Sequence, residues 1–430
     1  MDQNRRKFIK TVAGTAGTLA MMPLVKSTLA LSPTLKLKDP PDLTSNLPES
    51  GEDFWGWVQQ SYSVSPTIHN LNNGGVSPQP KVVQEAFEMY NRQCNEAPSY
   101  YMWRVLDKGR ESLRVKLAEL SGCSSEELAI NRNTTESLDT IIAGLRLKKG
   151  DEVVLCYYDY PNMRQGWEQR AKREGIVLKY IDLPMPVEDD EAILKAYTDQ
   201  FTSKTRIVHI THIINYTGQV LPARKIADAA HDKGIDVVID GAHSYAHLNY
   251  KIPDLGGDYY GTSLHKWLCA PFGTGLLYVK KEKIPGLWTT FPNPDPELDD
   301  IRKFENLGTR SFPAEEAIGH AIDFHNIIGA KRKEDRLRYL THYWVERVKD
   351  VKGLKLYTSL KPKYACALTT FGIEGKTGNE ISSYLFKEHR IHTTSIKYRS
   401  VDGVRVTPHI YTTTTVLDEL VKGIRKYAAG

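Results

Sequence analysis

Between residues 128 and 279, short apolar runs alternate with amphipathic helical patterns, and this alternation constrains the fold more than any other feature. The runs "DEVVLCYY", "TRIVHITHI" and "IDVVID" have apolar residues at neighbouring positions rather than at every second one. Such strands are buried on both faces, as in parallel sheets that helices cover on each side. The helical patterns between them, such as "MRQGWEQRAKREG", end in glycine. We therefore predict an α/β fold with a mostly parallel sheet.

The flanking segments predict a division into domains. Helical patterns that begin near Pro80 introduce the alternating region, and we assign residues 80–292 to one large domain. A long helix is then expected from about Pro313 to Lys349, followed by short strands and helices. We expect residues 293–430 to form a smaller α+β domain. Residues 31–79, which contain the proline-rich and acidic "KDPPDLTSNLPES", are expected to form an N-terminal arm or linker.

The first thirty residues have the features of an export signal. A charged stretch, "NRRKFIK", precedes a weakly apolar run and the small residues "STLA". Arg5 and Arg6, followed by Phe8 and Ile9, resemble a twin-arginine (Tat) signal. An ordinary amphipathic N-terminal helix is the alternative. We predict a Tat signal peptide over residues 1–30, removed after Ala30, with export to the periplasm by the Tat machinery.

The charge balance argues against a nucleic-acid partner. The chain has 57 lysines and arginines against 52 acidic residues. Removing residues 1–30 takes away five basic residues and one acidic residue, which leaves 52 basic against 51 acidic residues. The remainder is nearly neutral and lacks the basic surface that nucleic acids require. The five cysteines have no spacing typical of a metal site, and Cys156 and Cys269 lie in apolar stretches expected to be buried.

Polar side chains follow the ends of several predicted strands. In parallel α/β sheets, functional groups gather at the carboxyl ends of the strands. The residues there comprise two threonines that open a helix, an aromatic ring, an amide, a carboxylate with a nearby histidine, and a serine, histidine and lysine. They are Thr134, Thr135, Tyr160, Asn215, Asp240, His243, Ser263, His265 and Lys266.

This set resembles the class V aminotransferase family of fold-type-I enzymes, which depend on pyridoxal 5′-phosphate (PLP). The segments "HIINYTGQVLP", "VVIDGAHSYAH" and "TSLHKW" carry the resemblance, with Lys266 placed 26 residues after Asp240. It extends from "LNNGGVSPQP" to the end of the chain. The motifs "DGAH" and "RVTPHIYTT" are most similar to those of the isopenicillin N epimerase branch. The resemblance implies a PLP cofactor, a small amino acid or peptide-like substrate, and a homodimer with a shared active site.

The resemblance implies that Lys266 forms the internal aldimine with PLP and then moves the proton at the substrate α-carbon. An amine must lose its proton to react, and the apolar neighbours Trp267 and Leu268 lower its pKa by desolvation. Asp240 is expected to pair with the pyridine nitrogen and preserve the ring as an electron sink. A carboxylate that only caps the turn before Gly241 is the alternative.

The same resemblance implies a phosphate site. Thr134 and Thr135 open a helix, where free N–H groups favour an anion, although such residues are often simply helix caps. Ser263 and His265 match further phosphate contacts of the family. Thr309, in "ENLGTRSF", matches a threonine that reaches the phosphate of the neighbouring subunit, so the active site is expected to need a dimer.

Three residues are expected around the cofactor ring. Tyr160 matches the ring-stacking position, with Tyr158 as the alternative because "YYDYPN" aligns ambiguously. Asn215 is expected to bond the phenolic oxygen of PLP. His243 is expected near the ring, and a histidine satisfied within a turn is its alternative.

Two arginines are candidates for binding substrate. Arg405, in "VDGVRVTPHIY", matches the arginine that binds the substrate carboxylate in a bidentate manner, for which lysine is a poor replacement. An arginine on an edge strand with no such role is the alternative. Arg164 is a weaker candidate on the substrate side.

The expected reaction begins with loss of the α-proton, most like that of an isopenicillin N epimerase-type enzyme. An aminotransferase or C–S lyase of the same family is the alternative, and a non-catalytic PLP-binding scaffold is an alternative of another class. A desulfurase that forms a persulfide is disfavoured, because "IHTTSIKYRSVDG" before Arg405 contains no cysteine and Cys366 lies far upstream. A nucleotide-dependent oxidoreductase is disfavoured because no GxGxxG follows the first strand.

Overall fold

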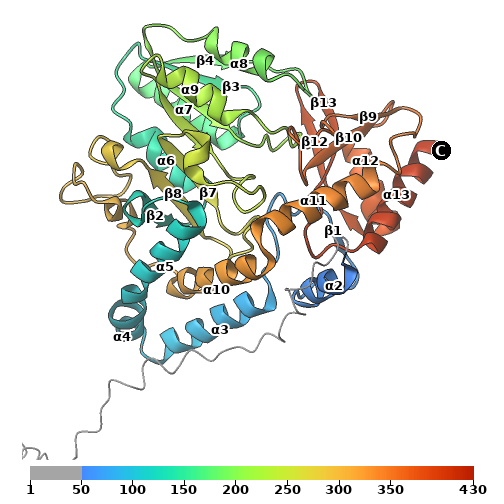
Figure 1. The fold of residues 1–430 in the computed structure, drawn as a ribbon, viewed down its shortest axis with the longest axis horizontal. Helices are drawn as coiled ribbons and strands as arrows, with labels where there is room; N and C mark the ends of the chain where they lie inside the picture. Colours follow the sequence, from blue (N-terminus) through green and yellow to red (C-terminus); the bar gives the residue numbers. More distant parts are fainter. Residues whose placement is uncertain (1–50) are drawn as a thin grey trace, which may run out of the picture. The chain divides into compact units, whose positions relative to one another are not determined.

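A seven-stranded sheet forms the centre of the larger part of the molecule in a computed structural model that describes residues 51–430 (Figure 1). The predicted signal peptide and residues 31–50 of the predicted arm lie outside the described residues. The strand order is β2-β8-β7-β6-β5-β3-β4, and only β8 runs antiparallel to its neighbours. The predicted mostly parallel α/β sheet is confirmed. The strands are β2 Leu128–Asn131, β3 Glu152–Cys156, β4 Val177–Ile181, β5 Thr205–Thr211, β6 Asp236–Asp240, β7 Tyr259–Ser263 and β8 Gly275–Val279.

Helices connect these strands and pack on the sheet. The core between them includes Ile141, Leu155, Trp167 and Leu277, all fully or almost fully buried. The N-cap of α6 is Asn133, whose side chain accepts a hydrogen bond from the backbone of Glu136, so the prediction that a threonine caps this helix is wrong. Asparagine takes the position because its short amide reaches back to the first turn. The helices are α6 Thr134–Gly144, α7 Pro161–Glu174, α8 Asp190–Thr198 and α9 Ala223–His231.

A second, four-stranded antiparallel sheet has the order β12-β13-β10-β9. Its core includes Trp344, Phe371, Leu385 and Leu420. Each strand is short, and β13 lies between two partners rather than at an edge. The strands are β9 Leu354–Leu356, β10 Thr369–Ile373, β12 Thr394–Tyr398 and β13 Val401–Val406, and the helices α12 Gly378–His389 and α13 Thr414–Ala429 pack with them.

The single long helix predicted over residues 313–349 is wrong, because two helices occupy this range. Helix α10 (Phe312–Ile328) ends at Gly329, and α11 (Ala330–Val345) begins directly after it. Gly329 has φ +85°, which glycine adopts at little cost and which breaks the helical path. The break lets α10 pack on α3 (Lys81–Glu96) and on α5, while α11 packs on α13.

The N-terminal part of the described chain buries one face of a helix and then pairs with a strand near the C-terminus. Helix α2 (Glu52–Gln60) buries Phe54, Trp55 and Val58. Strand β1 (His69–Asn70) then pairs in parallel with β11 (Ile391–His392), which brings the next residues beside Thr407. The remaining helices before the sheet are α4 Pro98–Tyr100, the π-helix η1 Tyr101–Leu106 and α5 Asp107–Ser121. The domain boundaries at residues 79 and 292 stay predictions.

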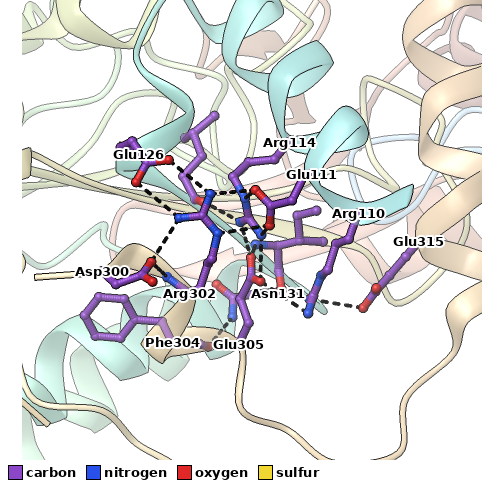
Figure 2. A network of polar contacts seen from close by, with 12 residues as sticks. Arg110, Glu111, Arg114, Glu126, Asn131, Asp300, Arg302, Phe304, Glu305 and Glu315 are labelled. Carbon is purple, nitrogen blue, oxygen red and sulfur yellow. Dashed lines mark hydrogen bonds and ion pairs between the residues drawn. The ribbon is translucent and has the colours of Figure 1, made fainter. Parts of the chain in front are cut away.

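A buried charge network closes the free edge of β2 (Figure 2). Glu305, at the end of the short helix η5 (Ile301–Glu305), accepts a hydrogen bond from the backbone of Ile130 over 2.6 Å and pairs with Arg110 and Arg114 of α5. Arg114 also donates to the carbonyl of Leu128 over 2.7 Å. Charged side chains thus satisfy backbone groups that an edge strand would otherwise expose.

Three further observations limit the kinds of site available. Among residues 51–430, no helix is long and apolar enough to cross a membrane. The same residues contain no group of three or more histidine, cysteine or acidic side chains placed to hold a metal ion. All five cysteines are free thiols, and Cys156 and Cys269 are buried, as predicted.

Candidate active site

A cavity of about 410 Å³ lies at the carboxyl ends of β6 and β7 and brings together ten of the predicted site residues. Residues from the start of α6 and from the ends of β5 and β13 complete its wall. Loops from distant parts of the chain also reach it. The predicted residues in the wall are Thr134, Thr135, Tyr160, Asn215, Asp240, His243, Ser263, His265, Lys266 and Arg405.

Lys266 follows β7 and reaches this cavity. Burial lowers its pKa to about 8, the nearby charge of Asp240 acts to raise it, and Arg405 acts to lower it. A substantial fraction of this amine is therefore unprotonated near neutral pH, as a nucleophile or a proton acceptor requires. The sequence prediction of a lowered pKa matches this environment.

The residue after Lys266 is clamped by ring stacking and a hydrogen bond. The indole of Trp267 stacks on His247, with ring centroids 3.8 Å apart, and on His409 at 5.4 Å, both at 16° between planes. The buried amine of Lys333, on α11, donates a hydrogen bond to the carbonyl oxygen of Trp267. These contacts fix the backbone that carries Lys266.

Asp240 ends β6 and is 2% exposed. Its Oδ1 accepts a hydrogen bond from the backbone of Ala242 over 2.9 Å, so the carboxylate does cap the turn. Burial raises its pKa, and the Ala242 N–H and the charge of Lys266 act in the opposite direction. Because Asp240 also lines the cavity, capping and contact with a cationic ring nitrogen are compatible.

The start of α6 contacts the end of β7, where the predicted phosphate site requires an anion cup. The N–H of Thr134 donates to Ser263 Oγ over 2.9 Å, and the two hydroxyl oxygens lie 2.7 Å apart. A Cβ atom added at Gly275 would lie 2.5 Å from the backbone nitrogen of Asn133, so glycine allows the close approach of β8 to the helix start. His265 donates from Nδ1 to the Thr274 carbonyl over 3.0 Å, and burial lowers its pKa to about 4.

The structure distinguishes the two tyrosines proposed for ring stacking. Tyr160 is 40% exposed and lines the cavity. Tyr158 is buried away from it, with its hydroxyl 3.2 Å from Ser400 Oγ. Of the two, only Tyr160 lines the cavity, and its role in ring stacking stays a prediction.

Besides Nε of Arg405, two buried polar atoms in the cavity wall have no hydrogen-bond partner among the described residues. They are Oδ1 of Asn215 and Nδ1 of His243. Burial, followed by the charges of Lys266 and Arg405, keeps the pKa of His243 well below its usual value. A buried polar atom normally has a partner, so these atoms favour a polar ligand in the cavity.

Arg405 is a buried cation held by neutral oxygens. Its Nη1 donates to the carbonyl of Asn215 over 2.8 Å and its Nη2 to Oδ1 of Asn72 over 3.0 Å. Its Nε has no partner, and it forms no ion pair within residues 51–430. Burial lowers its pKa to about 10. Because β13 is an interior strand, the alternative of an edge-strand arginine is wrong.

Two predicted residues lie outside the cavity wall. Thr309 is exposed on the loop that follows η5, so a contact with another subunit stays a prediction. Arg164 lies on α7 one turn after Tyr160, with its guanidinium over the ring of Tyr398.

Sequence reasoning missed Gly74 and Gly75 in the wall, and it missed Asn72, which lies behind the wall and accepts a hydrogen bond from Arg405. A Cβ atom at Gly74 would lie 3.1 Å from Thr407, which is tight, and 3.5 Å from the Arg405 guanidinium, so glycine eases the approach of this segment to Thr407. The glycine pair in "NNGGV" was the available signal.

The chemistry of the wall fits PLP. Each kind of group around the cavity complements one part of this cofactor. The lysine with a lowered pKa suits the aldehyde, and the buried carboxylate suits the ring nitrogen. The helix start with its hydroxyls suits the phosphate, the aromatic ring suits the ring face, and the unpartnered amide oxygen suits the phenolic oxygen.

Comparisons with known proteins agree with this site. The family model described as "Aminotransferase class-V" matches residues 69–412. An isopenicillin N epimerase from Amycolatopsis lactamdurans is 28% identical over 391 residues, which cover 86% of this chain and 98% of that protein. A probable cysteine desulfurase from Halalkalibacterium halodurans is 28% identical over 404 residues, covering 86% and 95%. A cysteine desulfurase structure from Thermococcus onnurineus NA1 has TM-score 0.77 and 21% identity, covering 87% and 98%. The structural likeness shows the predicted PLP-dependent transferase fold type I.

Proposed function

Because this chain belongs to the class V aminotransferase family and is a PLP-dependent enzyme, we propose that it acts at the α-carbon of an amino acid or aminoacyl substrate, with epimerisation as its reaction. The observation that carries the proposal is the buried Arg405 beside Lys266 in one cavity. It supports a site that binds a carboxylate next to a proton acceptor.

The cofactor, when bound, supplies an electron sink that weakens a bond at the substrate α-carbon. Lys266 would hold it, and Asp240 would keep its ring nitrogen protonated. The start of α6 with Ser263 and His265 would bind its phosphate, because hydroxyls and the positive end of the helix dipole favour an anion there. Tyr160 would pack on the ring face and Asn215 would bond the phenolic oxygen.

Arg405 selects the substrate carboxylate. A buried guanidinium bonded only to neutral oxygens keeps its full positive charge, and a carboxylate compensates it through short charge-assisted hydrogen bonds. Lys266, whose amine would be freed when the substrate amine takes its place, has a pKa of about 8 and would then accept the α-proton as a base. Return of a proton from solvent to the opposite face of the α-carbon would invert the stereocentre.

The positions of the cysteines favour this reaction over persulfide formation. Within residues 51–430, no cysteine lines the cavity, and the β12–β13 hairpin before Arg405 contains none. Cys366 is buried, and burial raises its pKa to about 12. A thiolate is the reactive form of cysteine, so this thiol is unsuited to attack. An aminotransferase or C–S lyase reaction of the same family is the second candidate.

The test is proton exchange at the α-carbon. Purified holoenzyme is incubated in D₂O with pairs of L- and D-amino acids and short peptides that carry a free α-amino acid end, and NMR and chiral chromatography follow the products. Epimerisation predicts deuterium at the α-carbon together with inversion from both enantiomers. Release of a keto acid would indicate transamination, and release of sulfide with pyruvate a C–S lyase. No exchange with any compound, by protein that does carry the cofactor, would favour a non-catalytic scaffold.

The proposal includes a homodimer and export. Thr309 lies on an exposed loop, which supports a contact with the phosphate site of the partner subunit. Light scattering should give the mass of two chains, and a monomer with full activity would contradict the shared site. Tat export to the periplasm is proposed from the sequence of residues 1–30. Fractionation and N-terminal sequencing of the native protein test it, with a mature chain that starts after Ala30 as the expected result.

A further inference from the structure

Arg164 is held in one position by neutral groups. Its Nε donates a hydrogen bond to the carbonyl oxygen of Asp159 over 3.1 Å. Its guanidinium lies 5.0 Å from the centroid of the Tyr398 ring, which in turn stacks on Tyr216 at 4.6 Å and 11°. Within residues 51–430 Arg164 forms no ion pair, so its positive charge has no compensating carboxylate among these contacts.

The carboxyl group of Asp159 forms no ion pair with Arg164. This residue is fully buried, with Oδ1 accepting from the hydroxyl of Thr211 and Oδ2 from the backbone of Cys156, each over 2.7 Å. Burial raises its pKa to about 7, against the effect of these hydrogen bonds and of the charge of Arg164. Both oxygens are therefore occupied, and the group is only partly ionised at neutral pH.

A second arginine that lies over a tyrosine ring is different. Arg399 lies over the ring of Tyr157, 4.1 Å from its centroid, and forms an ion pair with Asp182. The two arginines thus share the same kind of aromatic support, but only Arg399 has a carboxylate partner. Aromatic support alone therefore does not explain why Arg164 lacks one.

The unpaired guanidinium lies beside the cavity. Arg164 is one helical turn from Tyr160, and Tyr160 and Asn215 both line the cavity. The next residue, Tyr216, is close enough that the charge of Arg164 lowers its pKa, against the effect of burial. Asn215 accepts a hydrogen bond from Arg405. Asn215 thus lies next to the guanidinium of Arg405, and Tyr216 next to that of Arg164. Neither arginine has a carboxylate partner among the described residues.

We propose that Arg164 recognises a second carboxylate, so that the preferred substrates are amino acids or aminoacyl groups with an anionic side chain. This inference rests on the proposed function, in which Arg405 binds the α-carboxylate. A guanidinium pre-positioned by a carbonyl and a ring loses little freedom on binding, and its planar fork suits a carboxylate.

A purely structural role for Arg164 predicts something else. In that case the arginine only ties α7 to the β12–β13 hairpin through Tyr398. Its loss would then weaken the fold or affect all substrates equally. Recognition of an anion predicts an effect confined to substrates that carry the second carboxylate.

The experiment compares matched substrates with holoenzyme. The pairs L-glutamate with L-glutamine and L-aspartate with L-asparagine are nearly isosteric and differ in the charge of the side chain. Binding is followed by the change in cofactor absorbance and turnover by α-proton exchange in D₂O. The variants are Arg164→Gln, Arg164→Lys, and Arg399→Gln as the matched control, and binding of the amide substrates reports whether each variant is folded.

We expect the wild type to prefer one acid over its amide by about 10- to 100-fold in apparent Kd, as one charge-assisted contact supplies. Arg164→Gln should remove this preference by weakening only the acid, Arg164→Lys should retain part of it, and Arg399→Gln should leave it intact. Equal binding of acid and amide, survival of the preference in Arg164→Gln, or equal losses for acid and amide in that variant would overturn the inference. If only neutral amino acids exchange their α-proton, the inference about Arg164 is contradicted but the proposed function is not. If no amino acid exchanges its α-proton, both are contradicted.

Discussion

His247 stacks on Trp267 with ring centroids 3.8 Å apart, one residue beyond the lysine predicted to hold the cofactor. Hydrogen bonds fix the histidine in turn. Its Nδ1 donates to the carbonyl of His243 over 2.7 Å, and its Nε2 accepts from the backbone of Ala367 over 3.0 Å. Burial lowers the pKa of His247 to about 3, so the ring stays neutral. The position of Lys266 thus depends on a loop that precedes β10 in the second sheet.

Replacing His247 with alanine should loosen this clamp. The variant loses the stacked ring and leaves the Ala367 N–H without its partner, so we expect the free energy of unfolding to fall by about 2–4 kcal/mol. Cofactor binding, measured by absorbance titration, should weaken as well. His247→Phe, which keeps a stacking ring and loses both hydrogen bonds, serves as the control and should retain most of the cofactor affinity. Unchanged affinity in the alanine variant would show that the clamp does not position Lys266.

The lowered pKa of Lys266 predicts how capture of the cofactor depends on pH. With a pKa of about 8, roughly a tenth of the amine is unprotonated at pH 7, against well under a thousandth for an ordinary lysine. The rate at which apoprotein binds PLP should therefore rise about tenfold per pH unit up to about pH 8 and then level off. Stopped-flow absorbance measures this rate. A rate still rising steeply above pH 9 would contradict the lowered pKa.

Glu305 should be among the most important charges for stability. Its carboxylate is almost fully buried between two arginines and also accepts a hydrogen bond from Ile130. Glu305→Ala removes one carboxylate partner from each of two buried arginines and leaves the Ile130 N–H without its acceptor, so we expect a loss of about 3–5 kcal/mol in chemical denaturation. Arg92→Ala removes an exposed ion pair with Glu88 and should cost less than about 0.5 kcal/mol. Similar losses in the two variants would contradict the account of the β2 edge.

Gly275 should tolerate no side chain. An added methyl would lie 2.5 Å from the Asn133 backbone, so Gly275→Ala must push β8 from the start of α6. We expect a loss of about 1–3 kcal/mol in stability and weaker binding of inorganic phosphate to the apoprotein. Gly319→Ala, on α10 with no heavy atom near the added methyl, is the control and should be neutral or slightly stabilising. Normal phosphate binding in Gly275→Ala would argue against the anion cup.

Much of the fold and the site could be predicted because they depend on local patterns. Apolar runs predict the strands. Because β6 and β7 are parallel neighbours, Asp240 and Lys266, which lie at or after their carboxyl ends, are on the same edge of the sheet. The contact between Arg405 and Asn72 could not be predicted, because it depends on the pairing of β1 with β11, strands of two residues each with no apolar pattern. The helix break at Gly329 was missed because isolated glycines also occur within helices, as Gly319 does in α10. Periodicity alone does not distinguish these cases.

The most direct test of the central claim is to locate the lysine that holds the cofactor. Holoenzyme is reduced with borohydride, digested and analysed by mass spectrometry for the peptide that carries the pyridoxyl group. Lys333 is an internal comparison, because burial lowers its pKa to about 8 as well, yet its amine is bonded to the Trp267 carbonyl. We predict the modification on Lys266 and none on Lys333, with loss of the absorbance band near ~420 nm in Lys266→Ala. A pyridoxyl group on Lys333, or an unmodified Lys266 in protein that binds PLP, would contradict the assignment of this cavity.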